Sequence, residues 1–352
     1  MSFEWLDALL VDYTTTQNIA GCVCCVASLK EILFFEAYGY AQVEPKRVKL
    51  NRATMFDLAS LTKPFATALA IMQLYDEQRI ALSDTVQQYL PAFKNTINGE
   101  KTIEELLAHT SGMPAWYPLY VLPPDERVRF LANTNSNAGR VVYSCPGYIV
   151  LGMIIEAVTN MRLDQYCQTY LYGKIGAHRT FFGPTELSNV AATERGNQHE
   201  KELATQFGDI GHVPWREHVL KGEVHDGNAH YCFDGVAGNA GLFSNASDLL
   251  LMARQYCAGT IVQRETMRMM TRDWTGTQSK RGLGWVMDAY HGAFSERTFS
   301  HTGFTGTLFV ADPEQDVFII LLTNAVHPVV RPELTAALRN AVVQEVSRAL
   351  NA

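Results

Sequence analysis

The sequence predicts an α/β protein in which an antiparallel sheet, flanked by helices and built from both ends of the chain, is joined to a helical lobe. Strand-like segments rich in β-branched and aromatic residues occur near the N-terminus, at 21–29 and 32–40, and again near the C-terminus. The intervening sequence consists of helical segments separated by loops rich in Pro and Gly. We therefore expect residues 1–79 and 230–352 to form the sheet domain, residues 80–229 to form the lobe, and a functional site to lie in the cleft between them.

Three helices are predicted before the C-terminal part. Residues 2–13 repeat apolar side chains at helical spacing after Ser2, a residue type that caps helix N-termini. A second helix is expected from about 64 to 75, and it is hydrophobic on nearly every face, which is typical of a buried helix. A third helix is expected at 149–159, after the break that Pro146-Gly147 predicts.

The C-terminal part returns to strands and ends in a helix. Strands are predicted at 283–290, 307–311 and 317–323. The last of these contains a continuous apolar run, which fits a central strand that is covered on both faces. The helix after Pro332 carries an apolar stripe formed by Leu334, Leu338, Val342, Val346 and Leu350.

Composition excludes several classes of protein. The 352 residues are 47% hydrophobic and 18% charged, which excludes intrinsic disorder. The formal net charge of −7 argues against a nucleic-acid partner, because such a partner requires a basic face. No apolar run reaches the ~18 residues that span a bilayer, so no membrane association is expected. The N-terminus lacks a basic segment followed by an apolar one, so we expect a cytoplasmic protein, or a periplasmic one if a leader has been removed.

The seven cysteines form an odd number, and Cys22, Cys24 and Cys25 crowd one strand-like segment. In a chain of this length we interpret them as buried thiols in a reducing compartment rather than as a disulfide framework. A metal site is disfavoured, because nothing nearby supplies the second pair of ligands that zinc requires.

A serine and a lysine stand three residues apart at the head of the buried helix, in Phe56-Asp-Leu-Ala-Ser60-Leu-Thr-Lys63-Pro. At this spacing both side chains project from one face, one turn apart. A serine hydroxyl becomes a nucleophile when a base takes its proton, and a lysine whose pKa is lowered by burial can be that base. The helix N-terminus would stabilise the oxyanion that the attack creates. The alternative is that Ser60 only caps the helix and that Lys63 is solvated.

Two further segments supply matching chemistry. Tyr143 precedes a predicted helix, and its phenol can share a proton with Lys63, because the free pKa values of Tyr and Lys are similar. His301-Thr302-Gly303 lies at or beside a C-terminal strand, where a glycine allows close approach of a substrate. The N–H of Phe304 would then be a second oxyanion donor. The alternatives are an ordinary half-buried tyrosine and a plain hairpin turn.

In this order and spacing, Ser60-x-x-Lys63, Tyr143-x-Cys145 and His301-Thr302-Gly303 resemble the three signature elements of the serine β-lactamase and penicillin-binding-protein superfamily. The most similar branch contains class C β-lactamases, D-alanyl-D-alanine carboxypeptidases and family VIII esterases. The resemblance extends from about Gly21 to the end of the chain. It includes the stretches 56–64, 107–113, 148–156, 238–244 and 301–306.

The resemblance implies a role for each motif residue. Ser60 would be the acylated nucleophile, and Lys63 with Tyr143 the proton-transfer pair, without a choice between them as the base. The N–H groups of Ser60 and Phe304 would form the oxyanion hole. His301 would face the carboxylate of a substrate. The implied mechanism is acylation of Ser60 followed by attack of water, with no metal or organic cofactor.

Two departures from the family pattern concern the substrate. The second motif usually ends in Asn and here ends in Cys145, whose thiol donates and accepts hydrogen bonds only weakly. His301 would be mostly neutral at pH 7, so it anchors a carboxylate less firmly than a lysine would. We expect a β-lactamase-like serine hydrolase of the esterase, D-Ala-D-Ala carboxypeptidase or β-lactamase type, acting on a small molecule or a peptide. The alternative is a non-catalytic relative that senses a ligand.

Other candidates receive a structural interpretation. His225-Asp226 resembles a metal-binding or acid–base pair, but no partner stands at metal-ligand spacing. His109, Ser111 and Gly112 match the family but are interpreted as a loop that turns and hydrogen-bonds to itself.

Overall fold

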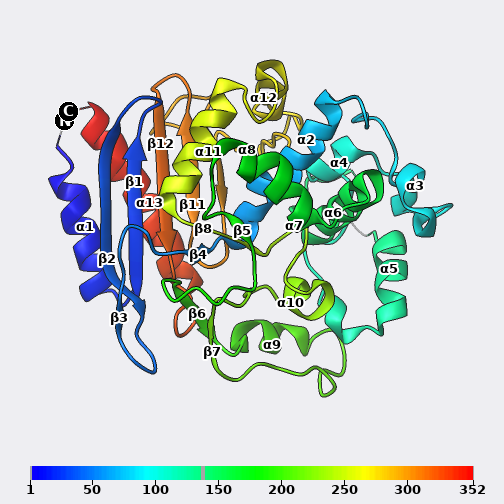
Figure 1. Ribbon diagram of the computed structural model, residues 1–352, viewed down its shortest axis with the longest axis horizontal. Helices are drawn as coiled ribbons and strands as arrows, with labels where there is room; N and C mark the ends of the chain where they lie inside the picture. The colour runs from blue at the N-terminus through cyan, green and yellow to red at the C-terminus, as the bar shows by residue number, and fades with distance from the viewer. Residues whose placement is uncertain (1, 136–138, 352) are drawn as a thin grey trace.

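The computed structural model describes residues 2–135 and 139–351 and confirms the predicted fold class (Figure 1). Across these residues the main sheet has seven strands in the order β3-β2-β1-β12-β11-β10-β9. All neighbouring strands are antiparallel. The strands are β1 (Gly21–Ala27), β2 (Ile32–Gln42), β3 (Val48–Lys49), β9 (Val286–Met287), β10 (Phe299–Thr302), β11 (Leu308–Asp312) and β12 (Val317–Thr323).

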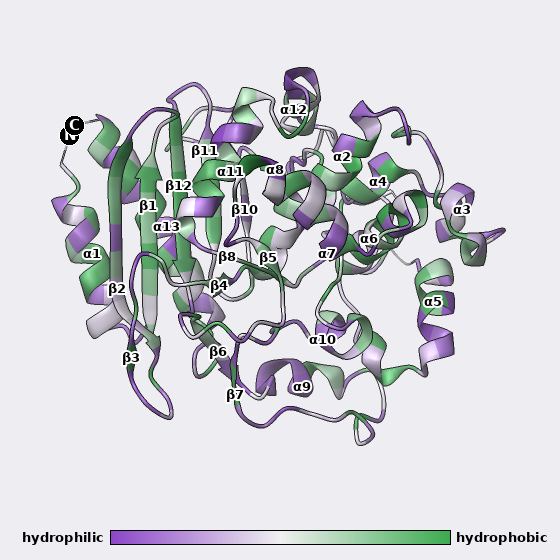
Figure 2. Ribbon diagram, viewed as in Figure 1, coloured by the Kyte–Doolittle hydropathy of each residue, from purple (hydrophilic) through white to green (hydrophobic). Residues whose placement is uncertain are grey.

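The two ends of the chain meet at the centre of this sheet. Strand β1 pairs with β12 from Cys22 opposite Thr323 to Ala27 opposite Phe318. Every residue of both strands is buried, as the apolar run at 317–323 predicts. Figure 2 shows these strands in the hydrophobic colour along most of their length.

Helices cover both faces of the sheet. On one face, α1 (Glu4–Thr15) and α13 (Pro332–Asn351) pack through Leu6, Leu10, Leu338 and Val342, so the predicted terminal helices are confirmed (Figure 1). On the other face lie the buried helix and α11 (Ala246–Ala258), followed by α12 (Arg264–Met270).

The buried helix begins irregularly. A 3₁₀ turn, η1 (Ala59–Leu61), leads into a π-helical segment, η2 (Lys63–Ala68), which continues as α2 (Leu69–Asp76). All residues from Leu61 to Leu74 are buried, so the expectation of a helix in the middle of the protein is confirmed. Phe65 contacts Trp285 and Phe309 edge to face, which fixes the helix against the sheet.

The middle of the chain is mainly helical and lies to one side of the sheet (Figure 1). Short strands interrupt it, and one of them, β5, joins β4 and β8 in a small sheet. The division at residues 79 and 229 stays a prediction. The middle of the chain, together with the two strands β4 and β8 that pair beside it, contains the remaining elements: β4 (Phe56–Asp57), α3 (Val86–Tyr89), η3 (Pro91–Phe93), η4 (Asn98–Glu100), α4 (Ile103–Leu107), η5 (Leu119–Val121), α5 (Pro124–Asn133), α6 (Cys145–Thr159), α7 (Leu163–Tyr166), η6 (Cys167–Tyr172), α8 (Gly173–Ile175), β5 (Phe181–Phe182), β6 (Ala192–Arg195), α9 (Gln198–Ala204), β7 (Val219–Lys221), α10 (Gly227–Phe233) and β8 (Leu242–Ser244).

Several boundaries differ from the sequence prediction, most of them by one or two residues. Helix α6 begins at Cys145 rather than at 149, because Pro146 occupies the first turn, where its missing N–H costs nothing, and Ser144 caps the helix. The strand predicted at 283–290 is reduced to Val286–Met287. Ser2 does not cap α1, since Phe3 occupies the cap position.

All seven cysteines are free, and Cys22, Cys24 and Cys25 are buried. In the described part of the chain, no helix combines the length and the apolar character needed to cross a bilayer.

Candidate active site

The predicted nucleophile lies on a tight turn between β4 and the buried helix. Ala59, which precedes Ser60, has φ +47°, an unfavourable conformation for a residue with a Cβ. The Asp57 carboxylate stabilises this turn, because its Oδ1 accepts a hydrogen bond from the Ala59 N–H at 2.8 Å. Ser60 is partly exposed, so the turn presents its hydroxyl to solvent while its neighbours remain buried.

Lys63 is completely buried, and its ammonium group lies directly beside the predicted nucleophile. Its Nζ is 2.9 Å from Ser60 Oγ, which is a hydrogen-bond distance. The backbone carbonyl of Asn239 accepts a second hydrogen bond from Nζ at 3.0 Å, and Cys145 Sγ lies 3.5 Å away. The alternative of a solvated Lys63 is therefore excluded.

Tyr143 completes the group from the loop before α6. The centroid of its ring lies 4.9 Å from Lys63 Nζ. Its position depends on His109, whose carbonyl accepts from the Val142 N–H at 2.9 Å and whose Nδ1 accepts from the Ser144 N–H at 3.0 Å. His109 therefore does more than close its own loop, since it holds the chain on both sides of Tyr143.

The proton affinities of this pair differ from the sequence expectation. Burial acts to lower the pKa of Lys63, but Cys145, Tyr143 and Asp226 act in the opposite direction, and the pKa is raised overall. Burial raises the pKa of Tyr143, and the opposing effects of Lys63 and Ser60 do not cancel it. The condition that the pKa of Lys63 is lowered is therefore not met in the resting site, where the lysine is an ammonium and the tyrosine a neutral phenol.

His301 lies at the end of β10 and is 3% exposed. Its Nδ1 is 2.8 Å from the carbonyl of Thr302, and its Nε2 has no hydrogen-bond partner in the described structure. Burial, followed by the charge of Lys63, lowers the pKa of His301 to about 3. The ring is therefore neutral at pH 7, as expected, and a substrate carboxylate would find no positive charge on it.

Gly303 lies where the turn after β10 packs closely against the turn that carries Ser60. A Cβ at this position would lie 2.3 Å from the Leu58 carbonyl oxygen and 2.2 Å from Thr307 Oγ1. Thr307 Oγ1 itself donates to the Leu58 carbonyl at 3.0 Å, and Thr305 Oγ1 donates to the Asp57 carbonyl at 2.8 Å. The glycine therefore lets the turn after β10 contact the nucleophile turn, and since Gly303 also lines the cavity, its contact with a substrate stays a prediction.

A cavity of about 550 Å³ brings the predicted residues together. Lys63 lies behind its wall, in contact with Ser60 and Cys145. Six of the seven predicted site residues line it, namely Ser60, Tyr143, Cys145, His301, Gly303 and Phe304.

Comparison with known proteins agrees with this geometry. The model of the family described as Beta-lactamase matches residues 6–344. The chain belongs to this beta-lactamase family. It is 32% identical to an N-acetylmuramyl-L-alanine amidase of Bacillus subtilis, with 92% of this chain and 82% of that protein covered. It is also 32% identical to a putative D-alanyl-D-alanine carboxypeptidase of Escherichia coli, with 86% and 78% covered. The fold resembles that of EstCE1, a hydrolase with promiscuous acyltransferase activity, with a TM-score of 0.73, 22% identity, and 97% and 98% covered.

As a member of the beta-lactamase family, the protein is a serine hydrolase. Its cavity also contains polar residues that the sequence did not single out as site residues. Asp226 accepts a hydrogen bond from the Asn239 side chain at 3.1 Å, and the Asn239 carbonyl holds Lys63. Glu200 lies beside Asp226, and burial followed by the charge of Asp226 raises its pKa to about 7. In the sequence analysis, only the His225-Asp226 pair, which resembles a metal-binding or acid–base pair, drew attention to residues of this wall of the cavity.

Two arginines line the same cavity, Arg281 and Arg339. Arg339 donates to the Gly306 carbonyl at 3.1 Å and also to the Gly303 carbonyl, so it supports the turn after β10. Arg281 lies with its guanidinium carbon 5.7 Å from the Tyr143 ring centroid. No sequence motif marks either residue.

We predict that Gly303→Ala lowers the free energy of unfolding by about 1–3 kcal/mol, because the added methyl overlaps the Leu58 carbonyl. Ester hydrolysis should fall as the two turns separate. Thermal unfolding and p-nitrophenyl acetate hydrolysis measure both effects. Gly211→Ala is the matched control, since its Cβ would meet only the flexible Asp209 side chain. Wild-type stability in Gly303→Ala would contradict the packing argument.

Proposed function

We propose that this serine hydrolase cleaves an amide or an ester through an acyl-enzyme on Ser60. The observation that carries the proposal is the 2.9 Å hydrogen bond between Lys63 Nζ and Ser60 Oγ in a cavity that also presents Tyr143. A serine hydroxyl is activated by an adjacent group that can take its proton, and Lys63 lies in hydrogen-bond contact with the partly exposed Ser60 hydroxyl.

In the proposed mechanism, Ser60 Oγ attacks the substrate carbonyl carbon while its proton passes to the Lys63–Tyr143 pair. Because both pKa values are raised, the pair must first release one proton, and the two residues then titrate as a unit. The carbonyl oxygen becomes an oxyanion that accepts hydrogen bonds from the Ser60 and Phe304 N–H groups. The C–N or C–O bond breaks, and the leaving group takes the proton from the pair. Water then repeats these steps on the ester of Ser60 and releases the acid.

The substrate is proposed to be a small molecule or a peptide derived from the bacterial cell wall. The names of two 32%-identical relatives, an N-acetylmuramyl-L-alanine amidase and a putative D-alanyl-D-alanine carboxypeptidase, support this class. A panel of p-nitrophenyl esters, D-Ala-D-Ala peptides, a muramyl-L-alanine amide and a chromogenic cephalosporin tests it. Turnover of the cephalosporin alone would contradict the proposed class.

A ligand sensor without catalysis is the second candidate, and Cys145 is the feature that favours it. Its thiol lies 3.5 Å from Lys63 Nζ and can offer a substrate only weak hydrogen bonds. Intact-mass spectrometry after incubation with a fluorophosphonate and with penicillin separates the two functions. Adducts together with ester turnover support the hydrolase. A stable penicillin adduct without any turnover supports the sensor.

We predict that Cys145→Asn raises the ratio of amide to ester hydrolysis by about fivefold, because an amide side chain hydrogen-bonds a substrate N–H and C=O more strongly than a thiol. A p-nitroanilide and a p-nitrophenyl ester of the same acyl group measure this ratio. Cys257→Asn, on α11, is the matched control. An unchanged ratio in Cys145→Asn would mean that this position does not contact the substrate.

A further inference from the structure

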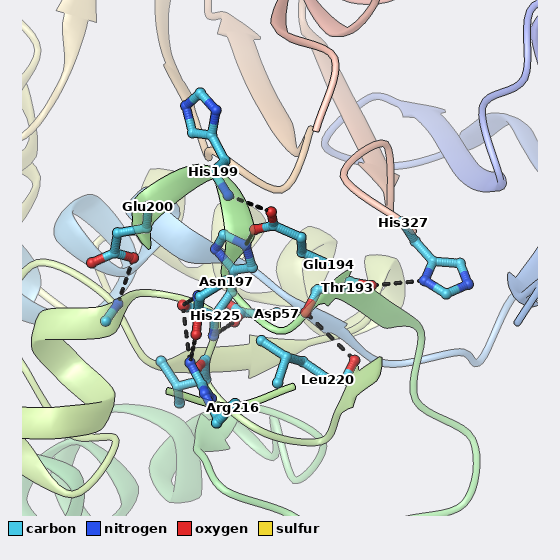
Figure 3. Close-up of polar contacts among 12 residues, drawn as sticks. Asp57, Thr193, Glu194, Asn197, His199, Glu200, Arg216, Leu220, His225 and His327 are labelled. Atoms are coloured by element: carbon cyan, nitrogen blue, oxygen red, sulfur yellow. Dashed lines mark hydrogen bonds and ion pairs between the residues drawn. The ribbon is translucent and has the colours of Figure 1, made fainter. Parts of the chain in front are cut away.

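A cluster of three buried titratable side chains lies against the wall of the cavity. We call Asp57, Glu194 and His225 the His225 cluster; their exposed fractions are 2%, 2% and 3% (Figure 3). His225 Nε2 lies 2.9 Å from Glu194 Oε2, and the His225 backbone N–H donates to Asp57 Oδ2 at 2.7 Å. Asp57 lies on β4, Glu194 on β6 and His225 in the segment before α10, so the cluster connects three separate parts of the chain.

This cluster contacts the backbone next to Ser60 and the side chain of Phe304, the two residues whose N–H groups are the proposed oxyanion donors. The Asp57 carboxylate accepts a hydrogen bond from the Ala59 N–H and therefore stabilises the turn that carries Ser60. The ring of His225 stacks on the ring of Phe304, with the centroids 5.4 Å apart and an interplanar angle of 23°. Phe304 is 45% exposed and lies in the turn after Gly303, so this stacking supports its inner face.

The backbone of His225 is anchored independently of its ring. Asn197 Nδ2 donates to the His225 carbonyl at 2.6 Å, and Arg216 donates to the Val224 carbonyl at 2.8 Å (Figure 3). Glu194 is held as well, since its Oε1 accepts from the His199 N–H at 2.7 Å. A change of the His225 ring therefore alters the support of Phe304 while the surrounding chain keeps its hydrogen bonds.

We propose that His225, held by Glu194, is a positioning residue that fixes the Phe304 N–H relative to the Ser60 N–H. An oxyanion hole acts only when its donors lie within about 2.7–3.1 Å of the developing charge, so small displacements of one donor reduce the rate. The proposal rests on the proposed acyl-enzyme mechanism. It assigns a function to His225, which the sequence analysis considered only together with Asp226 and interpreted as structural.

The electrostatics of the cluster are consistent with this role. Burial acts to lower the pKa of His225, but the hydrogen bond and charge of Glu194, then the charges of Asp57 and Glu200, raise it overall. Asp226, the next residue, adds another negative charge, since it raises the pKa values of Asp57 and Glu200. The protonated His225 ring therefore binds Glu194 most strongly below about pH 6.5. The stabilisation that this ion pair provides is lost as the pH rises through the folded-state pKa of His225.

A series of variants tests the proposal with p-nitrophenyl acetate and a fluorophosphonate as probes. His225→Phe keeps a ring against Phe304 but loses the bond to Glu194, whereas His225→Ala loses both. We expect kcat to fall about threefold in the first and about thirtyfold in the second, with KM changed less than twofold. The rate constant for labelling by the fluorophosphonate should fall in parallel. Glu194→Gln, which keeps the size of the side chain, should resemble His225→Phe.

The exposed pair His218–Glu223, with His218 Nε2 2.5 Å from Glu223 Oε1, provides the control, and His218→Ala should match the wild type. Thermal unfolding shows that each variant is folded at the assay temperature. Wild-type kcat and labelling in all three folded variants would overturn the positioning role. A wild-type protein that neither hydrolyses the ester nor reacts with the fluorophosphonate would instead overturn the proposed function, and the inference with it.

Discussion

Replacement of Ser60 by alanine is expected to abolish labelling by a fluorophosphonate and to lower ester hydrolysis by about 10⁴-fold or more. The variant lacks the hydroxyl that lies 2.9 Å from Lys63 Nζ and is the proposed nucleophile. A water molecule cannot replace it, because the covalent intermediate that divides the reaction into two easier steps no longer forms. Intact-mass spectrometry and initial rates of p-nitrophenyl acetate hydrolysis measure both effects.

Stability should change little in this variant, since Ser60 is partly exposed and alanine fits the same turn. Ser188→Ala, at an exposed position away from the cavity, is the control and should react like the wild type. An adduct that persists on Ser60→Ala would point to another nucleophile. Cys145 would then be the first candidate, because its sulfur also contacts Lys63.

Much of the fold was predictable because its signals are local. The apolar run at 317–323 coincides with β12, and the all-round apolar helix is buried as expected. The spacing of Ser60 and Lys63 also predicted their contact, although the structure achieves it across a 3₁₀ and a π-helical turn rather than one α-helical turn. Adjacent turns of any tight helix bring residues three apart together, so the prediction did not depend on the helix type.

The charges and contacts of the site were not predictable, because they depend on residues distant in the sequence. The pKa of Lys63 reflects Cys145, Tyr143 and Asp226, which no local pattern connects to it. Position 303 requires a glycine because a Cβ there would overlap the Leu58 carbonyl oxygen. This carbonyl comes close to Gly303 only when β10 folds against the nucleophile turn.

The same reason explains why the sequence analysis did not connect His225 with Glu194. Beside Asp226 it has no partner at metal-ligand spacing, so the sequence favoured a structural interpretation. Its partner Glu194 stands 31 residues earlier and reaches the imidazole only after β6 is in place. Sequence spacing detects ligand pairs within one element but not a pair assembled from two.

Lys63→Met is the second change with a large expected effect, and it separates catalysis from stability. We expect kcat to fall by about 10³-fold, because the variant loses the group that exchanges a proton with Ser60. The free energy of unfolding should change by about 2 kcal/mol or less. The Asn239 carbonyl loses its donor, which costs about 1–3 kcal/mol, but a buried ammonium is replaced by an apolar chain of similar length.

The pH dependence identifies what Lys63 contributes. Because the pKa values of Lys63 and Tyr143 are both raised, kcat/KM of the wild type should increase with pH through the alkaline range as the pair loses a proton. In Lys63→Met the remaining activity should follow the titration of Tyr143 alone. Lys63→Arg keeps the charge but cannot release a proton, so it should be as inactive as Lys63→Met if proton transfer is required. The exposed Lys94→Met serves as the control. Substantial activity in a folded Lys63→Arg variant would show that the positive charge alone is sufficient and would contradict the proton-transfer role.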